Sequence, residues 1–273
     1  MSTAHVSFGN PDLWQSVYFE HKAPLDAIKG LEPLMRDLFA AAAGTKGTKA
    51  QRVIEMLVLT GARSFNDLIT LIGNGSGIGA MILSRGMFEY VVMAEYLRRN
   101  SREQADYTAF GIVTSWQRYQ KLKKDSPTVA KAVRAENVDE LRKKYGRAAN
   151  RMKDKNGKLR RQWHRKSLRQ MAEEIGLGEQ YAIPYGLAAS MHHGSFEGVA
   201  AHLGLEPEVV TFGEPSAEAW IEPALISGHV YILQLLETLN RAMRLDFKAR
   251  LATANEEFMR GWKGQTKKQV ASA

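Results

Sequence analysis

Apolar residues recur at helical spacing along most of the chain, and the apolar–polar alternation typical of strands is scarce. Ala, Leu, Met, Glu, Lys and Arg, which favour helices, dominate the periodic stretches. Clusters of glycine, proline and small polar residues interrupt these stretches at intervals. The pattern therefore predicts an all-α protein, a bundle of about seven to nine helices.

The expected elements lie between these interruptions. We expect helices over residues 24–43, 48–72, 78–99, 101–124, 165–175, 180–193 and 217–260, with short basic helices over 127–152 and with Ser101 as the N-cap of the fourth. The expected breaks are 73–79, 125–127, 153–161 and 204–216, the last with one short extended piece. Residues 1–260 should form one domain, and 261–273 a flexible tail. Its core should pair the 48–72 and 78–99 helices with the 180–193 and 217–260 helices.

Composition narrows the classes of protein to consider. The chain has no cysteine, which excludes disulfides, thiolate catalysis and cysteine-bound zinc. No apolar run reaches the roughly 18 residues of a membrane span, so no membrane contact is expected. The first 15 residues lack the basic start and apolar core of a signal peptide. We expect a cytoplasmic protein.

Positive charge is concentrated in one segment. Residues 118–169 hold 19 Lys and Arg against 5 Asp and Glu, a net charge of +14, whereas the rest of the chain has a net charge of −5. Such a basic subregion attracts polyanions, and nucleic acid first among them. The alternative is a solvated basic connection that only keeps the protein soluble. The candidate nucleic-acid contacts are Lys123, Lys124, Arg142, Lys143, Lys144, Arg160, Arg161 and Trp163.

The 78–97 stretch contains a charged pair in an otherwise apolar helix. Its only charged residues are Arg85, Glu89 and Glu95. Arg85 and Glu89 share a helical stripe with apolar residues, so both should be buried or line a cavity. As an exposed pair this order is the less favourable one. The residues leave two interpretations open: a buried polar clamp between helices, or an active-site arginine with a carboxylate base.

A second candidate lies in the stretch AASMHHGSFEG, residues 188–198. Ser190 and His193 are three residues apart and share a helical face. His193 precedes Gly194 in the last turn, where a histidine can donate to the unpaired carbonyl groups of a helix end. Alternatively, His193 is a general acid and base that Ser190 orients near Arg85 and Glu89.

Three pieces of the sequence together resemble DUF5677, a family of bacterial helical proteins of unknown function. They are SRGMFEYVVMAEYL, WHRKSLRQMAEEIG and YAIPYGLAASMHHGS, and they span about residues 50 to 200 in the same order. The resemblance implies an all-α domain and no established activity. It also implies that the polar positions of the family correspond to Arg85, Glu89, Trp163, Ser190 and His193.

The general appearance is also similar to HEPN-type helical domains of RNA-cutting toxins and phage-defence proteins. Those ribonucleases carry an arginine a few residues before a histidine on one helix. None of the seven histidines here has an arginine five to seven positions upstream, so the usual motif is absent. A composite site with Arg85 and His193 from different helices would be needed. No spacing of histidines fits a zinc motif, so no metal and no cofactor is expected.

We therefore expect a protein that acts on nucleic acid, RNA above all, of the toxin or phage-defence kind. The basic subregion would hold the phosphate backbone. Arg85 would stabilise phosphate charge and His193 would move protons, with Glu89 and Ser190 positioning them. The alternatives are a non-catalytic interaction module whose polar cluster is structural, and a bundle that binds a small ligand. The 217–260 helix is long enough for a homodimer contact.

Overall fold

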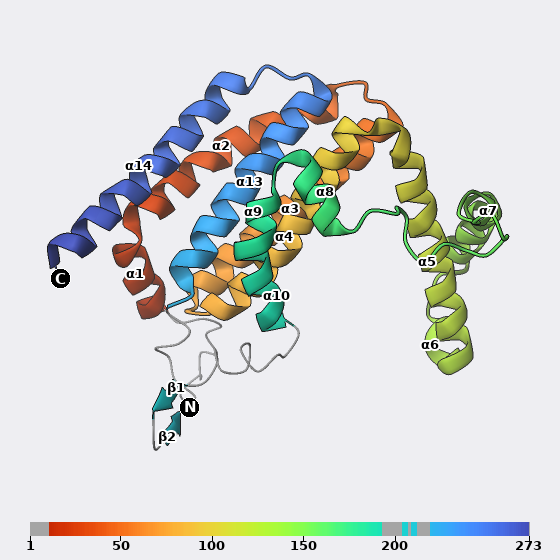
Figure 1. Cartoon of the computed structure of the whole chain (residues 1–273), viewed down its shortest axis with the longest axis horizontal. Helices are drawn as coiled ribbons and strands as arrows, with labels where there is room; N and C mark the ends of the chain where they lie inside the picture. The colour runs from red at the N-terminus through yellow and green to blue at the C-terminus, as the bar shows by residue number, and fades with distance from the viewer. Residues whose placement is uncertain (1–10, 193–203, 207–208, 212–218, 273) are drawn as a thin grey trace, which may run out of the picture. The chain divides into compact units, whose positions relative to one another are not determined.

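The computed structural model describes residues 11–192, 204–206, 209–211 and 219–272 (Figure 1). Helices make up nearly all of this part, and the all-α prediction is confirmed. The helical segments slightly outnumber the range expected, because several are very short. The two strands, β1 (Gly204–Glu206) and β2 (Val209–Thr211), form an antiparallel pair with Leu205 opposite Val210. This pair stands where one short extended piece was expected.

Contacts divide the chain into two compact units. Unit 1 comprises Met1–Arg98 and Met171–Ala273, and unit 2 comprises Arg99–Gln170. The basic subregion 118–169 lies within unit 2. The single domain expected over 1–260 stays a prediction.

Unit 1 is built from long helices with short helical segments beside them. The long ones are α2 (Lys22–Gly44), α3 (Lys49–Gly73), α4 (Gly77–Arg99), α13 (Ile221–Met243) and α14 (Lys248–Ser272). The short ones are α1 (Pro11–Glu20), α8 (Leu168–Ile175), α9 (Gly178–Gln180), the π-helical turn η2 (Tyr181–Tyr185) and α10 (Gly186–His192). The helix α13 packs against α3, α2 and α14, while α14 also lies along α2 (Figure 1). The expected pairing of the 48–72 helix with the C-terminal helical region is confirmed.

Glycine makes the approach of α3 to α13 close. A Cβ atom on Gly61 would lie 2.3 Å from Cδ1 of Leu235, and one on Gly228 would lie 3.0 Å from Cδ2 of Leu68. Leu68 and Leu235 are fully buried. The two helices therefore pack leucine against glycine, which brings their axes closer than larger residues would allow.

The ends of α3 follow from local chemistry. Thr48 and Gln51 form a capping box: the Gln51 backbone N–H donates to the Thr48 hydroxyl oxygen at 3.3 Å, and Gln51 Oε1 accepts from the Thr48 N–H at 2.7 Å. After the helix ends at Gly73, Gly75 adopts a φ of +74°, which favours glycine. This turn accounts for the break expected at 73–79.

The helices in the last part of the chain differ from those predicted from the sequence. We expected one helix over 217–260, but α13 ends at Met243 and Arg244 adopts a left-handed conformation with φ 57° and ψ 46°. The Leu245 N–H donates to the Asn240 carbonyl oxygen at 2.9 Å, which closes the C-terminus of α13. The helix α14 then runs to Ser272, through most of the expected tail. An arginine at the left-handed position gave no sequence signal, because glycine or asparagine normally occupies it.

The helix α4 is long and apolar enough to cross a membrane by length and composition. Yet 56% of its most apolar window is buried within the protein. Phe88 and Tyr96 on this helix are fully buried. Burial in the core therefore accounts for its apolar character.

Unit 2 is a smaller helical unit. It comprises η1 (Ser101–Glu103), α5 (Gln104–Asp125), α6 (Pro127–Lys131) and α7 (Ala135–Arg151), with α5 packed against both α6 and α7. Ser101 begins the 3₁₀ turn η1 instead of capping α5, which corrects the expected start of this helix by three residues. The buried residues of its core are Ala109, Val113, Ala148, Ala149 and Met152.

Candidate functional site

Arg85 and Glu89 form a polar cluster with a third residue, Tyr185. Nη2 of Arg85 lies 3.1 Å from Oε1 of Glu89. The Tyr185 hydroxyl donates to the same carboxylate oxygen at 3.2 Å and accepts a longer hydrogen bond from Arg85 Nη2 at 3.4 Å. The side chains of Arg85 and Glu89 are 22% and 39% exposed. The pair is therefore accessible at the protein surface, and not fully buried as its apolar neighbours in the sequence suggested.

A π-helical turn places Tyr185 in this cluster. The turn η2 (Tyr181–Tyr185) contains Pro184, which interrupts the normal hydrogen-bond pattern of the helix. The rings of Tyr181 and Tyr185 stack with centroids 4.8 Å apart, and Phe88 of α4 lies 5.2 Å from the Tyr185 ring. Single π-helical turns are frequent at functional sites. Tyr185 was not among the site residues predicted from the sequence, although Pro184 within a helical pattern marks an irregular turn beside it.

In this cluster the Tyr185 hydroxyl stays protonated, and one N–H group of Arg85 has no hydrogen-bond partner among the described residues. Burial raises the pKa of the Tyr185 phenol, and the charge of Glu89 adds to this, while the hydrogen bond from Arg85 opposes it. The hydroxyl is therefore a neutral donor near neutral pH. Nε of Arg85 is buried and has no hydrogen-bond partner among the described residues. This arrangement could orient an anion between a guanidinium group and a phenol.

The other two predicted catalytic residues are Ser190 and His193, of which Ser190 lies in α10. The Ser190 hydroxyl donates to the Leu187 carbonyl oxygen at 2.8 Å within the same helix. His193 lies outside the described residues. The structure thus brings Arg85 and Glu89 together and adds Tyr185, whereas the proximity of His193 to Arg85 stays a prediction. Among the residues that the structure describes, no three His, Asp or Glu side chains are grouped as a metal would require.

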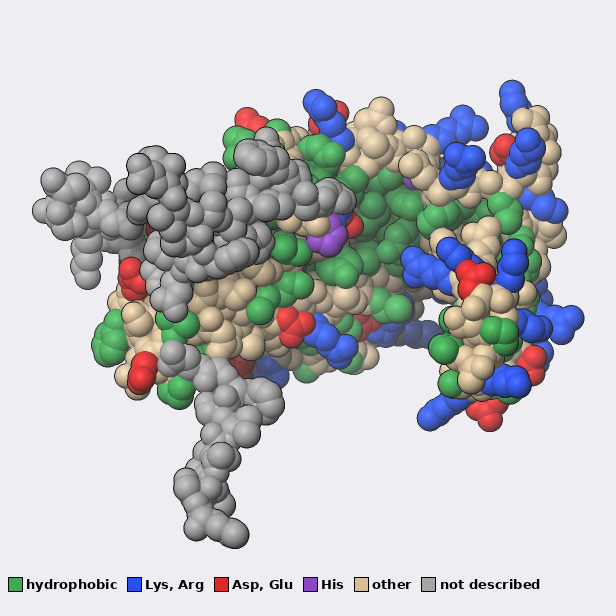
Figure 2. Space-filling model, turned by 90° about the horizontal axis from the view of Figure 1, so that it is seen from below, with side chains coloured by type: hydrophobic (Ala, Val, Ile, Leu, Met, Phe, Trp, Pro, Cys, Tyr) green, Lys and Arg blue, Asp and Glu red, His purple; other side chains and the backbone are tan. Residues whose placement is uncertain are grey.

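The second candidate site is in unit 2, which carries the basic excess of the whole chain. Residues 99–170 hold 21 Lys and Arg against 7 Asp and Glu, a net charge of +14, while the residues of unit 1 hold 17 against 22, a net charge of −5. Figure 2 shows Lys and Arg side chains over the surface of α5, α6 and α7. The division of charge thus coincides with the division into units.

Unit 2 has a cleft with predominantly basic walls, which we call the basic cleft. Its volume is about 660 Å³. Its lining residues come from the segment after α7, and they are Lys153, Asp154, Lys155, Asn156, Arg160, Arg161, Gln162, His164 and Arg165. The one acidic residue among them, Asp154, uses its Oδ1 to accept the backbone N–H groups of Asn156 at 2.8 Å and Lys158 at 2.9 Å. Asp154 therefore shapes a turn, at which Gly157 adopts a φ of +74°.

Ion pairs fix the wall of the basic cleft to α5. Asp106 of α5 accepts from Arg160 Nη2 at 2.8 Å and also binds Arg151 of α7. Burial acts to raise the pKa of Asp106, but the hydrogen bonds and charges of Arg160 and Arg151 outweigh it and hold this pKa below its usual value. His164 adds a contact from Nε2 to Glu103 Oε2 at 2.9 Å. The cleft is thus held in place by ion pairs between mostly half-buried side chains, while other cations remain exposed.

The residues predicted to bind nucleic acid divide into three groups. Arg160 and Arg161 line the basic cleft. Lys123, Lys124, Arg142, Lys143 and Lys144 are exposed on α5 and α7, and Lys144 forms an ion pair with Glu140. Trp163 is only 8% exposed and packs edge-on against Tyr107 with ring centroids 5.3 Å apart, so it supports the cleft and has little free surface for stacking on bases. Lys153, Lys155 and Arg165 were not among the residues predicted from the sequence, because only the fold of the 153–165 segment brings them together.

Comparison with known proteins supports the family resemblance. The model of a family of unknown function (DUF5677) matches residues 51–209. No curated protein and no solved structure matches the chain, and the similarity to HEPN-type domains stays a prediction. Since the match covers more than half of the sequence, the chain belongs to the DUF5677 family.

Proposed function

We propose that this protein acts on RNA and that unit 2 holds the phosphate backbone in its basic cleft. The observation that supports this most is the set of exposed cations at the cleft. Lys153, Lys155, Arg161 and Arg165 are all exposed, and no acidic side chain pairs with them in the part of the chain that the structure describes. Free cations of this kind are available to phosphates.

The charge of unit 2 gives the proposal its physical basis. Neutralising phosphates with Lys and Arg releases the counterions condensed on a nucleic acid, which drives binding without regard to sequence. A net charge of +14 also makes unit 2 repel itself in the absence of a polyanion. The exposed residues of α5 and α7, Lys123, Lys124, Arg142 and Lys143, would extend the contact beyond the cleft.

A charge-reversal experiment tests the binding proposal. We combine Lys155→Glu, Arg161→Glu and Arg165→Glu in one variant. Its affinity for a labelled single-stranded RNA is compared with that of the parent by fluorescence anisotropy. Three lost phosphate contacts should weaken binding on the order of 100-fold near 0.1 M salt, because each contact contributes about 0.7 to the exponent of the salt dependence.

The control variant makes the same change of net charge in unit 1. Arg36, Arg63 and Arg260 are exposed residues of that unit, and each is replaced by Glu in a second triple variant. This variant should bind RNA nearly as well as the parent. Equal losses in both variants would contradict a site in unit 2 and indicate a response to net charge alone.

We further propose that RNA is the substrate of a composite site in unit 1. Arg85 would stabilise charge on a phosphate and His193 would transfer protons, with Glu89 and Ser190 positioning them. The observation that favours this over a purely structural cluster is the partly exposed Arg85–Glu89 pair, which is hydrogen-bonded to Tyr185 of a π-helical turn. An RNA-cutting protein of this kind fits the cytoplasmic toxin or phage-defence class.

Cleavage is tested with end-labelled RNA, the parent and His193→Ala, with divalent ions present and absent. Thermal melting first establishes whether the two proteins are equally stable. Cleavage by the parent and none by an equally stable variant would support the composite site. If neither protein cleaves RNA and His193→Ala melts at a lower temperature, the cluster is structural and the catalytic proposal is wrong, while the binding proposal stands on its own test.

A further inference from the structure

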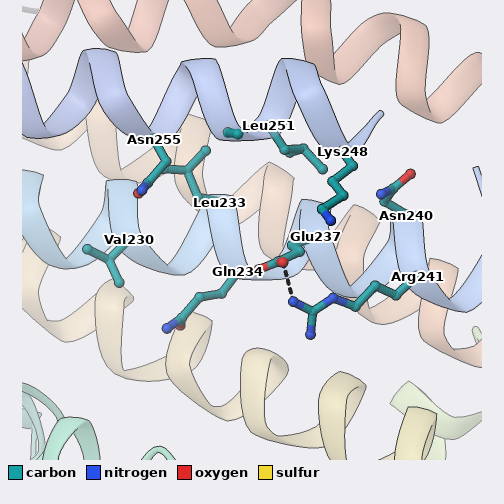
Figure 3. Close-up of a pocket in the computed structure, with 10 residues that line it drawn as sticks. Val230, Leu233, Gln234, Glu237, Asn240, Arg241, Lys248, Leu251 and Asn255 are labelled. Carbon is teal, nitrogen blue, oxygen red and sulfur yellow. Dashed lines mark hydrogen bonds and ion pairs between the residues drawn. The ribbon is translucent and has the colours of Figure 1, made fainter. Parts of the chain in front are cut away.

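A pocket between α13 and α14 in unit 1 has no part in the proposed function (Figure 3). Its volume is about 550 Å³, within the range of roughly 300–1,000 Å³ that small-molecule sites occupy. Leu233 of α13 and Leu251 of α14 are buried in its wall, and Val230 is half-buried beside them. The pocket therefore offers an apolar surface to one side of a ligand.

Charged groups around this pocket leave one positive charge without a partner. Glu237, the one acidic residue among the lining residues, forms an ion pair with Arg241 one turn further along α13 (Figure 3). Lys248 at the start of α14 also lines the pocket, and no ion pair engages it within the described part of the chain. The ion pair is neutral, so the ammonium group of Lys248 sets the net charge of the pocket.

A buried amide adds a donor at the same end. Asn240 is 7% exposed, and its Oδ1 accepts the backbone N–H of Phe247 at 3.2 Å. This bond fixes the orientation of the amide and leaves its Nδ2 as the donor. Because Lys248 follows Phe247 directly, the amide and the ammonium group lie at the same end of the pocket (Figure 3).

We propose that this pocket binds a small organic carboxylate with an apolar body. The carboxylate accepts from Lys248 and Asn240, and the body lies along Leu233 and Leu251. A hydrogen bond from a charged donor to a carboxylate is stronger than one between neutral groups. The carboxylate should therefore contribute substantially to the affinity of the ligand. A polyanion is disfavoured here, because unit 1 has a net charge of −5.

Three probe molecules separate the contributions of the head group and the body. Octanoate, octanol and acetate are titrated into the full-length protein, with binding followed by calorimetry and by NMR of the Asn240 side-chain amide. Octanoate should bind at least about tenfold more tightly than either of the others, since each of these lacks one half of the interaction. Equal binding of octanol and octanoate, or displacement of octanoate by RNA, would overturn the proposal.

A matched pair of variants assigns the effect to the pocket. Lys248→Gln should weaken octanoate about tenfold and leave octanol unchanged, because it removes the charge and keeps most of the side-chain length. Lys49→Gln is the control: Lys49 is exposed and begins α3, as Lys248 begins α14. It should change neither affinity. Octanoate binding that survives Lys248→Gln unaltered, with circular dichroism confirming the fold, would also overturn the proposal.

Discussion

The two units of this protein differ in the size of the side chains in their cores and in the sign of their net charge. Unit 1 buries large side chains such as Phe88, Tyr96, Tyr231 and Leu235 between long helices and has a net charge of −5. The core of unit 2 consists mainly of alanines with Val113 and Met152, and the unit has a net charge of +14. Unit 1 therefore gains its stability from apolar burial, whereas unit 2 exposes charge at the expense of its own stability.

This difference explains why ion pairs are important for the structure of unit 2. In unit 2 the end of α7 and the segment after it are tied to η1 and α5: Asp106 of α5 binds Arg151 and Arg160, and Glu103 of η1 binds His164. A small core cannot hold such a segment by apolar contact alone. We infer that a bound polyanion would stabilise unit 2 more than unit 1, since a ligand stabilises the state that binds it.

The largest expected effect is the loss of a core aromatic ring in unit 1. Phe88→Ala should lower the free energy of unfolding by about 3–5 kcal/mol, because Phe88 is fully buried against Tyr185 and Tyr231. The measurement is urea denaturation beside Val113→Ala in the core of unit 2. Val113→Ala should cost less, since fewer apolar atoms are removed. An equal or greater cost for Val113→Ala would break the contrast between the cores.

The next effect concerns the charge that holds unit 2 together. Asp106→Asn should cost about 2 kcal/mol in unit 2, because the half-buried carboxylate accepts charge-assisted hydrogen bonds from Arg151 and Arg160 that a neutral amide does not fully replace. The folded pKa of Asp106 is lowered, so its stabilisation is present above about pH 4 and is lost as the pH falls through that folded pKa. Urea denaturation at pH 7 measures the cost. A variant as stable as the parent would show that these ion pairs do not hold the unit.

A buried histidine should make unit 1 sensitive to acid. His229 is fully buried against Phe258, and burial lowers its pKa from 6.5 to about 3. The unfolded state takes up the proton first, so stability is fully present above about pH 6.5. It falls by about 1.4 kcal/mol per pH unit below that value, until about pH 3. Denaturation at pH 7 and pH 5 should show a loss of about 2 kcal/mol in the parent that His229→Phe abolishes; an identical loss in the variant would contradict this assignment.

The smallest effect sharpens the interpretation of the polar cluster. Tyr185→Phe removes a hydroxyl with two long hydrogen bonds to the partly exposed Arg85 and Glu89, and should change the stability of unit 1 by less than about 1 kcal/mol. The melting temperature of Tyr185→Phe is compared with that of Tyr181→Phe, a substitution on the same π-helical turn. A loss of several kcal/mol for Tyr185→Phe alone would identify the cluster as a structural clamp.

Helices that depend on the local sequence pattern were predicted, whereas features that depend on contacts between distant residues were missed. Helical periodicity predicted α2, α3 and α4 to within two residues at each end. The break at Arg244 was missed because a left-handed arginine leaves no composition signal. The stripe containing Arg85 and Glu89 was correctly identified, but Tyr185 joins it from about 100 positions away, beyond any local pattern. The basic cleft likewise needs the turn at Asp154 and the ion pairs of Asp106, which charge counting cannot show.

The salt dependence of RNA binding tests the central claim most directly. The logarithm of the binding constant of the parent for single-stranded RNA is plotted against the logarithm of salt concentration, beside the Lys155, Arg161 and Arg165 charge-reversal variant. The parent should give a steep negative slope, and the variant a slope shallower by about 2, because three phosphate contacts contribute roughly 0.7 each. Binding that does not depend on salt, or a slope that the variant leaves unchanged, would contradict phosphate recognition by the basic cleft of unit 2.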